Sequence, residues 1–112
     1  MKPLTDFQMR CESKLKDALI ERNLPLVNRR TAGKKEAYIV AEMPEVDLRL
    51  WIYEDEAMFT VGDKSYVYEA PDYPSQDMLI IAFVAAVIAC TKSEVPTDTG
   101  SARISLFKGK KL

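Results

Sequence analysis

A strict alternation of aliphatic and other side chains over residues 46–53 limits the possible folds of this chain more than any other feature. The segment reads VDLRLWIY, and every second residue from the valine is aliphatic. Successive side chains point to opposite faces of a β-strand, so the aliphatic residues share one face. The same period places Asp47, Arg49, Trp51 and Tyr53 on the other face. We therefore expect a half-buried strand whose aliphatic face lies in a core.

Other strand-like segments lie close to this one along the chain. Residues 37–43, 57–61 and 66–68 are rich in β-branched and aromatic side chains, which is typical of strands. The connections between them, such as Glu54-Asp55 and Gly62-Asp63, are too short for a crossover helix. Short connections force neighbouring strands to be antiparallel. The sequence therefore predicts an antiparallel meander of four to five strands.

Helical patterns flank these strands. Thr5 and Gln8 have the spacing of a capping box at the start of an amphipathic helix over about residues 6–23. Ser75 is a suitable N-cap for a second helix over about residues 76–91. That helix is apolar nearly all round, so it lies beneath another layer or against another chain. We expect an α+β fold in which both helices pack on the aliphatic face of the sheet.

The remaining segments carry weaker patterns. Residues 26–35 are basic and contain Ala32-Gly33, so we expect a loop or a weak hairpin there. Residues 92–101 have the composition of a linker. Residues 102–112 are either an added edge strand or a basic tail. The whole length, residues 1–112, fits a single domain.

Residue usage excludes several kinds of chemistry. The chain has no histidine, which removes histidine-based triads, zinc sites built on histidine and imidazole acid–base catalysis. No nucleotide-binding glycine loop or nucleophile-elbow motif occurs. Cys11 and Cys90 are expected to be buried thiols and not a disulfide. We therefore expect no enzyme activity and no cofactor.

The apolar segments also bear on location. The longest apolar run, residues 78–90, has thirteen residues, whereas a helix needs about twenty to cross a bilayer. The first residues, MKPLTDFQMR, lack the apolar stretch of a secretion signal. We expect a cytoplasmic protein with no membrane association. A monomer is expected if residues 78–90 are core, and a homodimer through this helix is the alternative.

Charge is segregated along the chain, although the formal net charge is only −1. Residues 36–77 hold eleven acidic and two basic residues, and both flanks are basic. Because strands fill most of the acidic stretch, we expect its carboxylates to gather on one face that steers a basic partner. A solvated acidic face that only maintains solubility and protects strand edges is the alternative.

The polar face of the strand at residues 46–53 is the candidate binding site. Aromatic side chains and arginine inside a charged rim are the groups that concentrate energy in protein interfaces. The predicted partner-binding residues are Asp47, Arg49, Trp51, Tyr53, Glu54, Asp55 and Glu56. Nucleic acid is not expected here, because phosphate binding needs lysine and arginine. The alternative is that the C-terminal tail or the first helix covers Trp51.

The three adjacent acids Glu54, Asp55 and Glu56 could in principle hold a divalent metal. Successive side chains diverge in a hairpin turn, however, and no glycine-bearing calcium loop surrounds them. We expect a solvated turn and no metal. A carboxylate–metal hydrolase that uses these three residues is the least favoured alternative function.

Two segments carry a resemblance to a known class of protein. These are V-D-L-R-L-W-I-Y-E-D-E at residues 46–56 and Y-E-A-P-D-Y-P-S at residues 68–75, which leads into the apolar helix. Over residues 4–91 the chain resembles immunity proteins of bacterial toxin–immunity systems, including those of contact-dependent inhibition and type VI secretion. The resemblance implies neutralisation of a cognate toxin, often a nuclease, by occlusion of its active site. It implies contact roles for Trp51, Tyr53, Glu54, Asp55 and Glu56.

A second class of binding protein shares the same general organisation. Type III secretion chaperones are small, acidic α+β proteins that dimerise through apolar surface, for which this chain would use residues 78–90. A chaperone is a stable dimer that binds an unfolded effector segment, whereas an immunity protein meets a folded toxin. The oligomeric state and the folding state of the partner therefore separate the two hypotheses.

Overall fold

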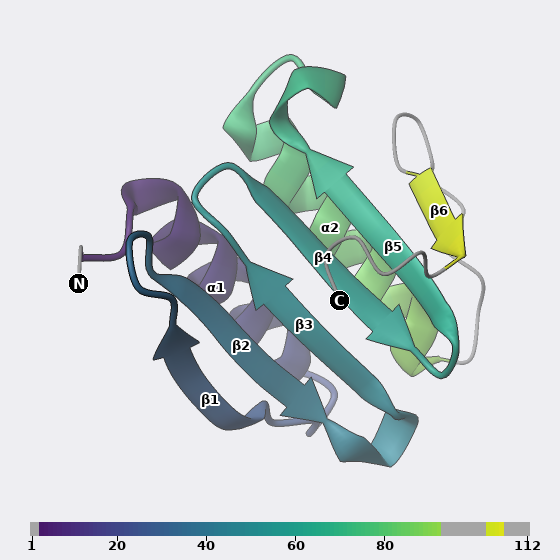
Figure 1. The fold of residues 1–112 in the computed structure, drawn as a ribbon. Helices are drawn as coiled ribbons and strands as arrows, with labels where there is room; N and C mark the ends of the chain where they lie inside the picture. Colours follow the sequence, from purple (N-terminus) through teal and green to yellow (C-terminus); the bar gives the residue numbers. More distant parts are fainter. Residues whose placement is uncertain (1–2, 93–102, 107–112) are drawn as a thin grey trace.

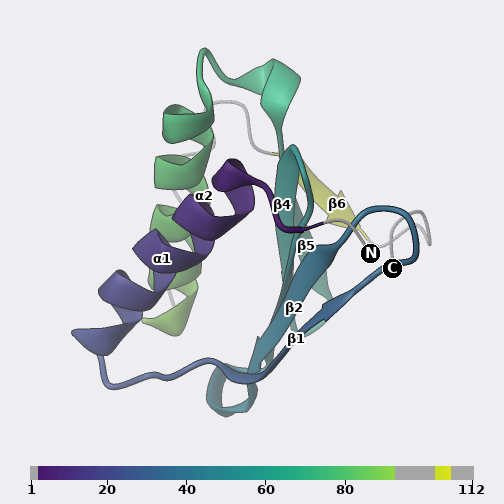
Figure 2. The ribbon, with the colours of Figure 1, turned by 90° about the vertical axis from the view of Figure 1, so that its left-hand side faces the viewer.

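An antiparallel sheet covered on one face by two helices forms the architecture of the computed structural model, which describes residues 3–92 and 103–106 (Figure 1). The order of the strands across the sheet is their order in the chain, and each strand is antiparallel to its neighbours. The strands are β1 (Val27–Ala32), β2 (Tyr38–Met43), β3 (Leu48–Ile52), β4 (Glu56–Val61), β5 (Lys64–Glu69) and β6 (Arg103–Leu106). The helices α1 (Asp6–Ile20) and α2 (Gln76–Thr91) lie side by side on the same face (Figure 2). The predicted α+β meander with both helices on one face is confirmed.

The start of α1 is fixed by the expected capping box, which also anchors the helix to the sheet. Thr5 Oγ1 accepts a hydrogen bond from the Gln8 backbone N–H at 3.2 Å, and Gln8 Oε1 accepts from the Thr5 N–H at 2.8 Å. The Gln8 Nε2 group donates to the carbonyls of Ala37 at 2.8 Å and Ile52 at 3.1 Å. Gln8 is fully buried, so these bonds satisfy its amide where water cannot.

The bounds of the two helices agree with the prediction to different degrees. α1 ends at Ile20, three residues before the predicted end, because Asn23 adopts a left-handed conformation with φ of 58°. The Leu24 N–H then donates back to the Leu19 carbonyl at 3.2 Å, which is the bonding pattern of a Schellman motif. The bounds of α2 agree with the prediction, and Ser75 Oγ accepts from the Met78 N–H at 3.2 Å.

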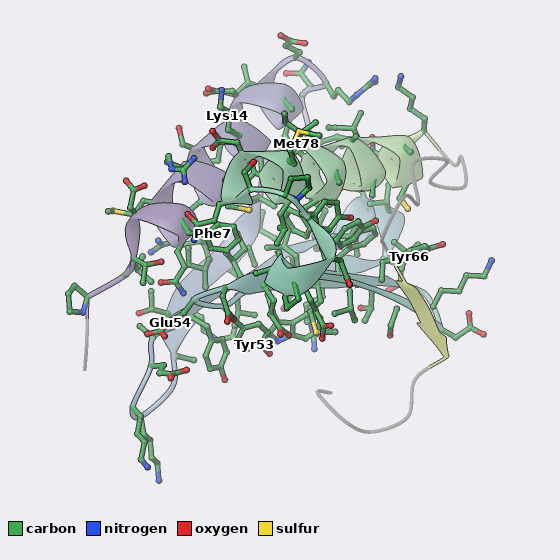
Figure 3. The ribbon with its side chains drawn as sticks, turned by 90° about the horizontal axis from the view of Figure 1, so that it is seen from above. Phe7, Lys14, Tyr53, Glu54, Tyr66 and Met78 are labelled. Atoms are coloured by element: carbon green, nitrogen blue, oxygen red, sulfur yellow. The ribbon has the colours of Figure 1, made fainter. Side chains whose placement is uncertain are left out.

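The core lies between the helices and the sheet. All three aliphatic side chains of β3 are buried in it, as the alternation predicts. An aromatic cluster from β4, β5 and α2 continues the core beneath α2. The ring of Phe59 stacks on Tyr66 with centroids 5.0 Å apart, and Phe83 meets it edge-on at 6.0 Å. Figure 3 shows Phe7 and Tyr66 between the helical layer and the sheet.

The segment at residues 26–35, predicted as a loop or weak hairpin, contains the edge strand β1. Five of its six side chains are exposed, so no alternation marks it in the sequence. Backbone pairing with β2 holds it in place. Arg29 adds a bidentate contact, donating to both carboxylate oxygens of Glu12 at 2.9 Å. Glu12 is only 8% exposed, so this pair ties β1 to α1.

The strand predicted at residues 46–53 begins later than expected. Residues Pro44–Val46 form a short 3-10 helix, and Asp47 follows in the left-handed region with φ of 55°. The Asp47 carbonyl accepts from the Gly62 N–H at 3.1 Å. This tight connection takes Val46 and Asp47 out of the strand, and β3 ends at Ile52, so the predicted strand is correct only over Leu48–Ile52.

At the other edge of the sheet, residues 103–106 form β6, with Val67 opposite Arg103 and Lys64 opposite Leu106. The edge-strand alternative for residues 102–112 is therefore correct over this part. Residues 107–112, where the basic tail was predicted, and most of the predicted linker at residues 92–101 lie outside the described residues.

Candidate functional site

The face of the sheet opposite α1 and α2 is the candidate site, and we call it the helix-free face because no helix in the described ranges lies on it (Figure 2). Strand register defines its side chains, which alternate with those of the core. Its central residues are Tyr38, Val40, Glu42, Arg49, Trp51, Tyr53, Glu56, Met58, Thr60, Ser65, Val67 and Glu69. Figure 3 shows Tyr53 on this side of the sheet, away from the helices.

A row of apolar side chains crosses the middle of the helix-free face. Val40 lies opposite Trp51, Trp51 lies opposite Met58, and Met58 lies opposite Val67. Val40 is 3% exposed and Met58 is 1% exposed, whereas Trp51 is half-buried. We call these four residues the apolar row. The alternative that the first helix covers Trp51 is wrong, because α1 lies on the other face.

An aromatic pair stands beside the apolar row. The rings of Tyr38 and Tyr53 have centroids 4.9 Å apart and are tilted by 37°. They line a surface hollow of about 430 Å³ together with the side chains of Lys34, Lys35, Glu36 and Glu54. Burial raises the pKa of Tyr53, and the neighbouring Tyr38 and Glu56 raise it further. The hydroxyl is therefore neutral at physiological pH and able to donate or accept a hydrogen bond.

Contrary to expectation, the acidic residues are not gathered on one face but are divided between the two ends of the sheet, with Glu45, Asp47 and Asp63 at one end and a larger group at the other. Only Glu42, Glu56 and Glu69 of the eleven acids in residues 36–77 belong to the helix-free face. The β3–β4 turn contains Glu54 and Asp55, and the Asp55 carbonyl accepts from the Ala70 N–H at 3.2 Å. That bond brings the turn against the connection that leads into α2. The acidic end of the sheet, as we name it, comprises Glu54, Asp55, Glu56, Glu69 and Asp72.

The seven predicted site residues do not form a single cluster. Trp51 and Tyr53 lie on the helix-free face, and Arg49 joins them there with its guanidinium 3.5 Å from the Glu42 carboxylate. The turn residues Glu54 and Asp55 and the first residue of β4, Glu56, follow at the acidic end. Asp47 precedes β3 at the opposite end, roughly 23 Å from Glu54 at the rise of an extended strand. It is therefore separate from the others.

Sequence reasoning missed the partners of Trp51 and Tyr53 on neighbouring strands. Tyr38 and Val40 lie in a segment that was predicted as a strand, but their face depends on the register between β2 and β3. Met58 was missed for the same reason on β4. The alternation of side chains along these segments was the available signal. It shows which residues share a face within one strand, but it assigns them to the helix-free face only once the register with β3 is known.

Neither cysteine provides a reactive group at this site. Burial raises the pKa of Cys11 to about 12, and the nearby Glu12 contributes to the increase. Cys90 is half-buried, and burial raises its pKa as well. Both are thiols and lie in the helical layer. The side chains of the site are therefore aromatic, apolar and charged.

Two further kinds of feature are absent from the described ranges. No group of three or more acidic or cysteine side chains there could hold a metal ion, so Glu54, Asp55 and Glu56 do not form such a group. No helix between residues 3 and 92 has the length and apolar character needed to span a membrane.

Comparisons with known proteins supply no relatives for this chain. No protein-family model matches it, and no curated protein or solved structure matches it either.

Proposed function

We propose that this chain is a non-enzymatic binding protein of the cytoplasm, and specifically an immunity protein that neutralises a cognate bacterial toxin by occluding its active site. The observation that carries the proposal is the apolar row beside the acidic end. Trp51 is half-buried between two buried apolar neighbours, with the Tyr38–Tyr53 pair next to it. A rigid aromatic anchor inside a charged rim is the arrangement that concentrates binding energy in protein interfaces.

The charge of the site indicates the chemistry of the partner. Glu54 lies beside the aromatic pair, Asp55 is exposed in the same turn, and Glu56 on β4 lies opposite Glu69 on the neighbouring strand β5. These carboxylates would attract a basic protein surface and would repel the phosphates of nucleic acid. A basic nuclease domain, whose own active site binds phosphates, is the kind of toxin that fits this surface.

Removal of the anchor is the direct test of the proposal. Trp51→Ala should weaken binding to a cognate toxin domain by ~2–4 kcal/mol, because the substitution empties the centre of the proposed interface. Ile20→Ala is the matched control, since Ile20 is exposed at the end of α1 on the other side of the molecule. Calorimetry measures both affinities. Equal affinities for the two variants would place the contact surface away from the helix-free face.

Charge reversal tests the acidic end separately. The double variant Glu54→Lys and Asp55→Lys should slow association and reduce its salt dependence, because steering acts over a Debye length of roughly 8–10 Å. The double variant Asp17→Lys and Glu21→Lys changes the net charge equally on exposed positions of the α1 side. It should leave the association rate close to that of the wild type. In cells that express the toxin, only the first pair of substitutions should abolish growth protection.

One observation favours the secretion-chaperone hypothesis as a second candidate. Met78 and Ile81 on α2 are exposed, apolar and at the surface of the helical layer. A chaperone would use such a surface in a tight dimer that binds an unfolded effector segment. A dimer that persists at nanomolar concentration, together with binding to an unfolded segment and not to a folded toxin domain, would favour this second function.

A further inference from the structure

The outward side of α2 carries an apolar stripe of four residues, of which only Ile88 also packs against the core. Met78 and Ile81 are 49% and 62% exposed, Ala85 is exposed, and Ile88 is half-buried. Their spacing of three, four and three residues places them along one line of the helix. We call these four residues the α2 stripe. Figure 3 shows Met78 on the side of the helical layer that faces away from the sheet.

The charges that bracket the α2 stripe are opposite and symmetric. No charged residue occurs between Asp77 and Lys92, and both of these residues are exposed. The midpoint of this interval falls between Val84 and Ala85. If two copies of α2 pair antiparallel about that midpoint, each Asp77 meets a Lys92 of the other copy. The helix dipoles also run in opposite directions in such a pair, so their ends attract.

We propose that a second copy of this chain binds along the α2 stripe in an antiparallel, two-fold symmetric pair. In this arrangement Ile81 packs against Ile88 of the partner subunit, and Asp77 faces Lys92 of the partner subunit. The small side chain of Ala85 lies beside the symmetry axis, where the two helices approach each other most closely. A two-fold interface must be self-complementary, and the α2 stripe satisfies this condition in both apolar pattern and charge.

The surroundings of the α2 stripe fit a modest interface. A groove of about 470 Å³ runs beside it, lined by Ile81, Val84 and Ala85 on α2 and by Arg10 and Lys14 on α1. The charged groups on α1 form one rim, and Arg10 is paired with both Asp6 and Asp77. The α2 stripe has four residues, whereas a standard protein interface has about 20–30 residues and roughly 800 Å² on each side. We therefore expect a dissociation constant in the ~1–100 µM range.

The inferred pair does not depend on the proposed toxin-binding function. The helix-free face lies on the opposite side of the sheet from α2 (Figure 2), so both copies keep that face exposed to a partner. The two surfaces can therefore be tested independently. A pair that dissociates on dilution also differs from the tight dimer that a secretion chaperone requires.

Sedimentation velocity tests the pair directly, over protein concentrations from about 1 µM to about 500 µM, a range that spans the expected dissociation constant. The wild type should shift from monomer to dimer across this range. Ile81→Glu should remain monomeric throughout, because the pair would bury the added carboxylate. Ile20→Glu is the matched control, since Ile20 is also an exposed isoleucine, 72% against 62%, but lies off the α2 stripe. It should associate like the wild type.

Charge exchange tests the antiparallel orientation. Asp77→Lys and Lys92→Asp should each weaken self-association by roughly tenfold, because each places like charges at both ends of the pair. Their equimolar mixture should recover the wild-type dimer, since both ends then pair opposite charges. Within one chain residues 77 and 92 lie about 22 Å apart along α2, so recovery in the mixture cannot come from contact within one chain.

Several results would overturn the inference. A wild type that stays monomeric at all concentrations would exclude the pair. If Ile81→Glu then lowered the free energy of unfolding and Ile20→Glu did not, the α2 stripe would be packed against another part of the same chain. A dimer that Ile81→Glu does not disrupt would place the interface elsewhere. A mixture of the two charge variants that remains monomeric would contradict the antiparallel orientation. Circular dichroism of each variant confirms that it is folded.

Discussion

The two faces of the sheet are built from the same strands but have different chemistry. On the helix-covered face, Leu50 is fully buried beneath the helices. On the helix-free face, its neighbours Arg49 and Trp51 remain at least partly exposed. Strand alternation separates the two roles, because adjacent residues point to opposite sides. A single strand, β3, therefore contributes both the core and the candidate binding surface, and substitutions one residue apart should have different consequences.

The two faces also differ in where their polar side chains form hydrogen bonds and ion pairs. Buried polar side chains of the helical layer form hydrogen bonds, such as those that Gln8 donates to the Ala37 and Ile52 carbonyls. On the helix-free face, charged residues such as Arg49 and Glu42 pair at the surface, where such pairs contribute little to stability. The helix-covered face therefore satisfies its polar groups inside the protein, whereas the helix-free face keeps this charged pair at the surface.

The largest expected effect comes from truncating the core side of β3. Leu50→Ala should lower the free energy of unfolding by ~2–5 kcal/mol, because it removes buried contacts and leaves a cavity. Arg49→Ala, one residue away on the other face, should change it by less than about 0.5 kcal/mol. Urea denaturation measures both. A loss below about 1 kcal/mol for Leu50→Ala would show that the two faces have been assigned the wrong way round.

A smaller effect should follow from changing the buried amide that joins α1 to the sheet. Gln8→Leu keeps the approximate volume but removes the donors to the Ala37 and Ile52 carbonyls. It should lower the free energy of unfolding by ~1–3 kcal/mol, because two buried acceptors lose their partner. The neighbouring exposed residue Met9 supplies the control, and Met9→Leu should be nearly neutral. Equal stability of the two variants would show that these bonds contribute nothing.

The smallest expected effect is a pH dependence from the buried thiol of the helical layer. Burial raises the pKa of Cys11 to about 12 from an ordinary value near 9. The folded state therefore holds this proton more tightly than the unfolded state. Its stabilising contribution is complete below about pH 9 and is lost as the pH rises toward 12. The slope from this group is at most about 1.4 kcal/mol per pH unit.

The Cys11 contribution is measured as a difference between two proteins. Unfolding free energies of the wild type and of Cys11→Ala are compared at pH 8 and pH 10 under reducing conditions. The wild type should lose more stability than the variant, because tyrosines and lysines that titrate in this range are common to both. Parallel pH profiles would mean that the thiol ionises normally and that water reaches this part of the core.

Much of the fold could be predicted from local sequence patterns. The alternation around Leu50, the capping box at Thr5 and Ser75 before α2 each act through neighbouring residues, and the structure confirms them. Strand β1 could not be predicted in this way, because its side chains are mostly exposed. Its position depends on pairing with β2 and on the Arg29–Glu12 contact between distant parts of the chain.

The candidate site was less predictable for a related reason. Trp51 and Tyr53 follow from the β3 alternation, but the neighbours Tyr38, Val40 and Met58 depend on strand register. A period of two does not specify register between strands. The acidic residues were expected on one face because they are close in sequence. Turns place most of them instead at the two ends of the sheet, five at the acidic end and Glu45, Asp47 and Asp63 at the opposite end.

The most direct test of the central claim uses Trp51 as its own probe. Trp51 is the single tryptophan of the chain, so its fluorescence reports only on the helix-free face. Titration with the toxin domain, in a variant of that domain from which its own tryptophans have been removed, should shift the emission to shorter wavelength. Binding should also protect Trp51 from acrylamide quenching, because the interface excludes water. Saturable binding with unchanged emission and unchanged quenching would contradict the assignment of this face as the partner surface.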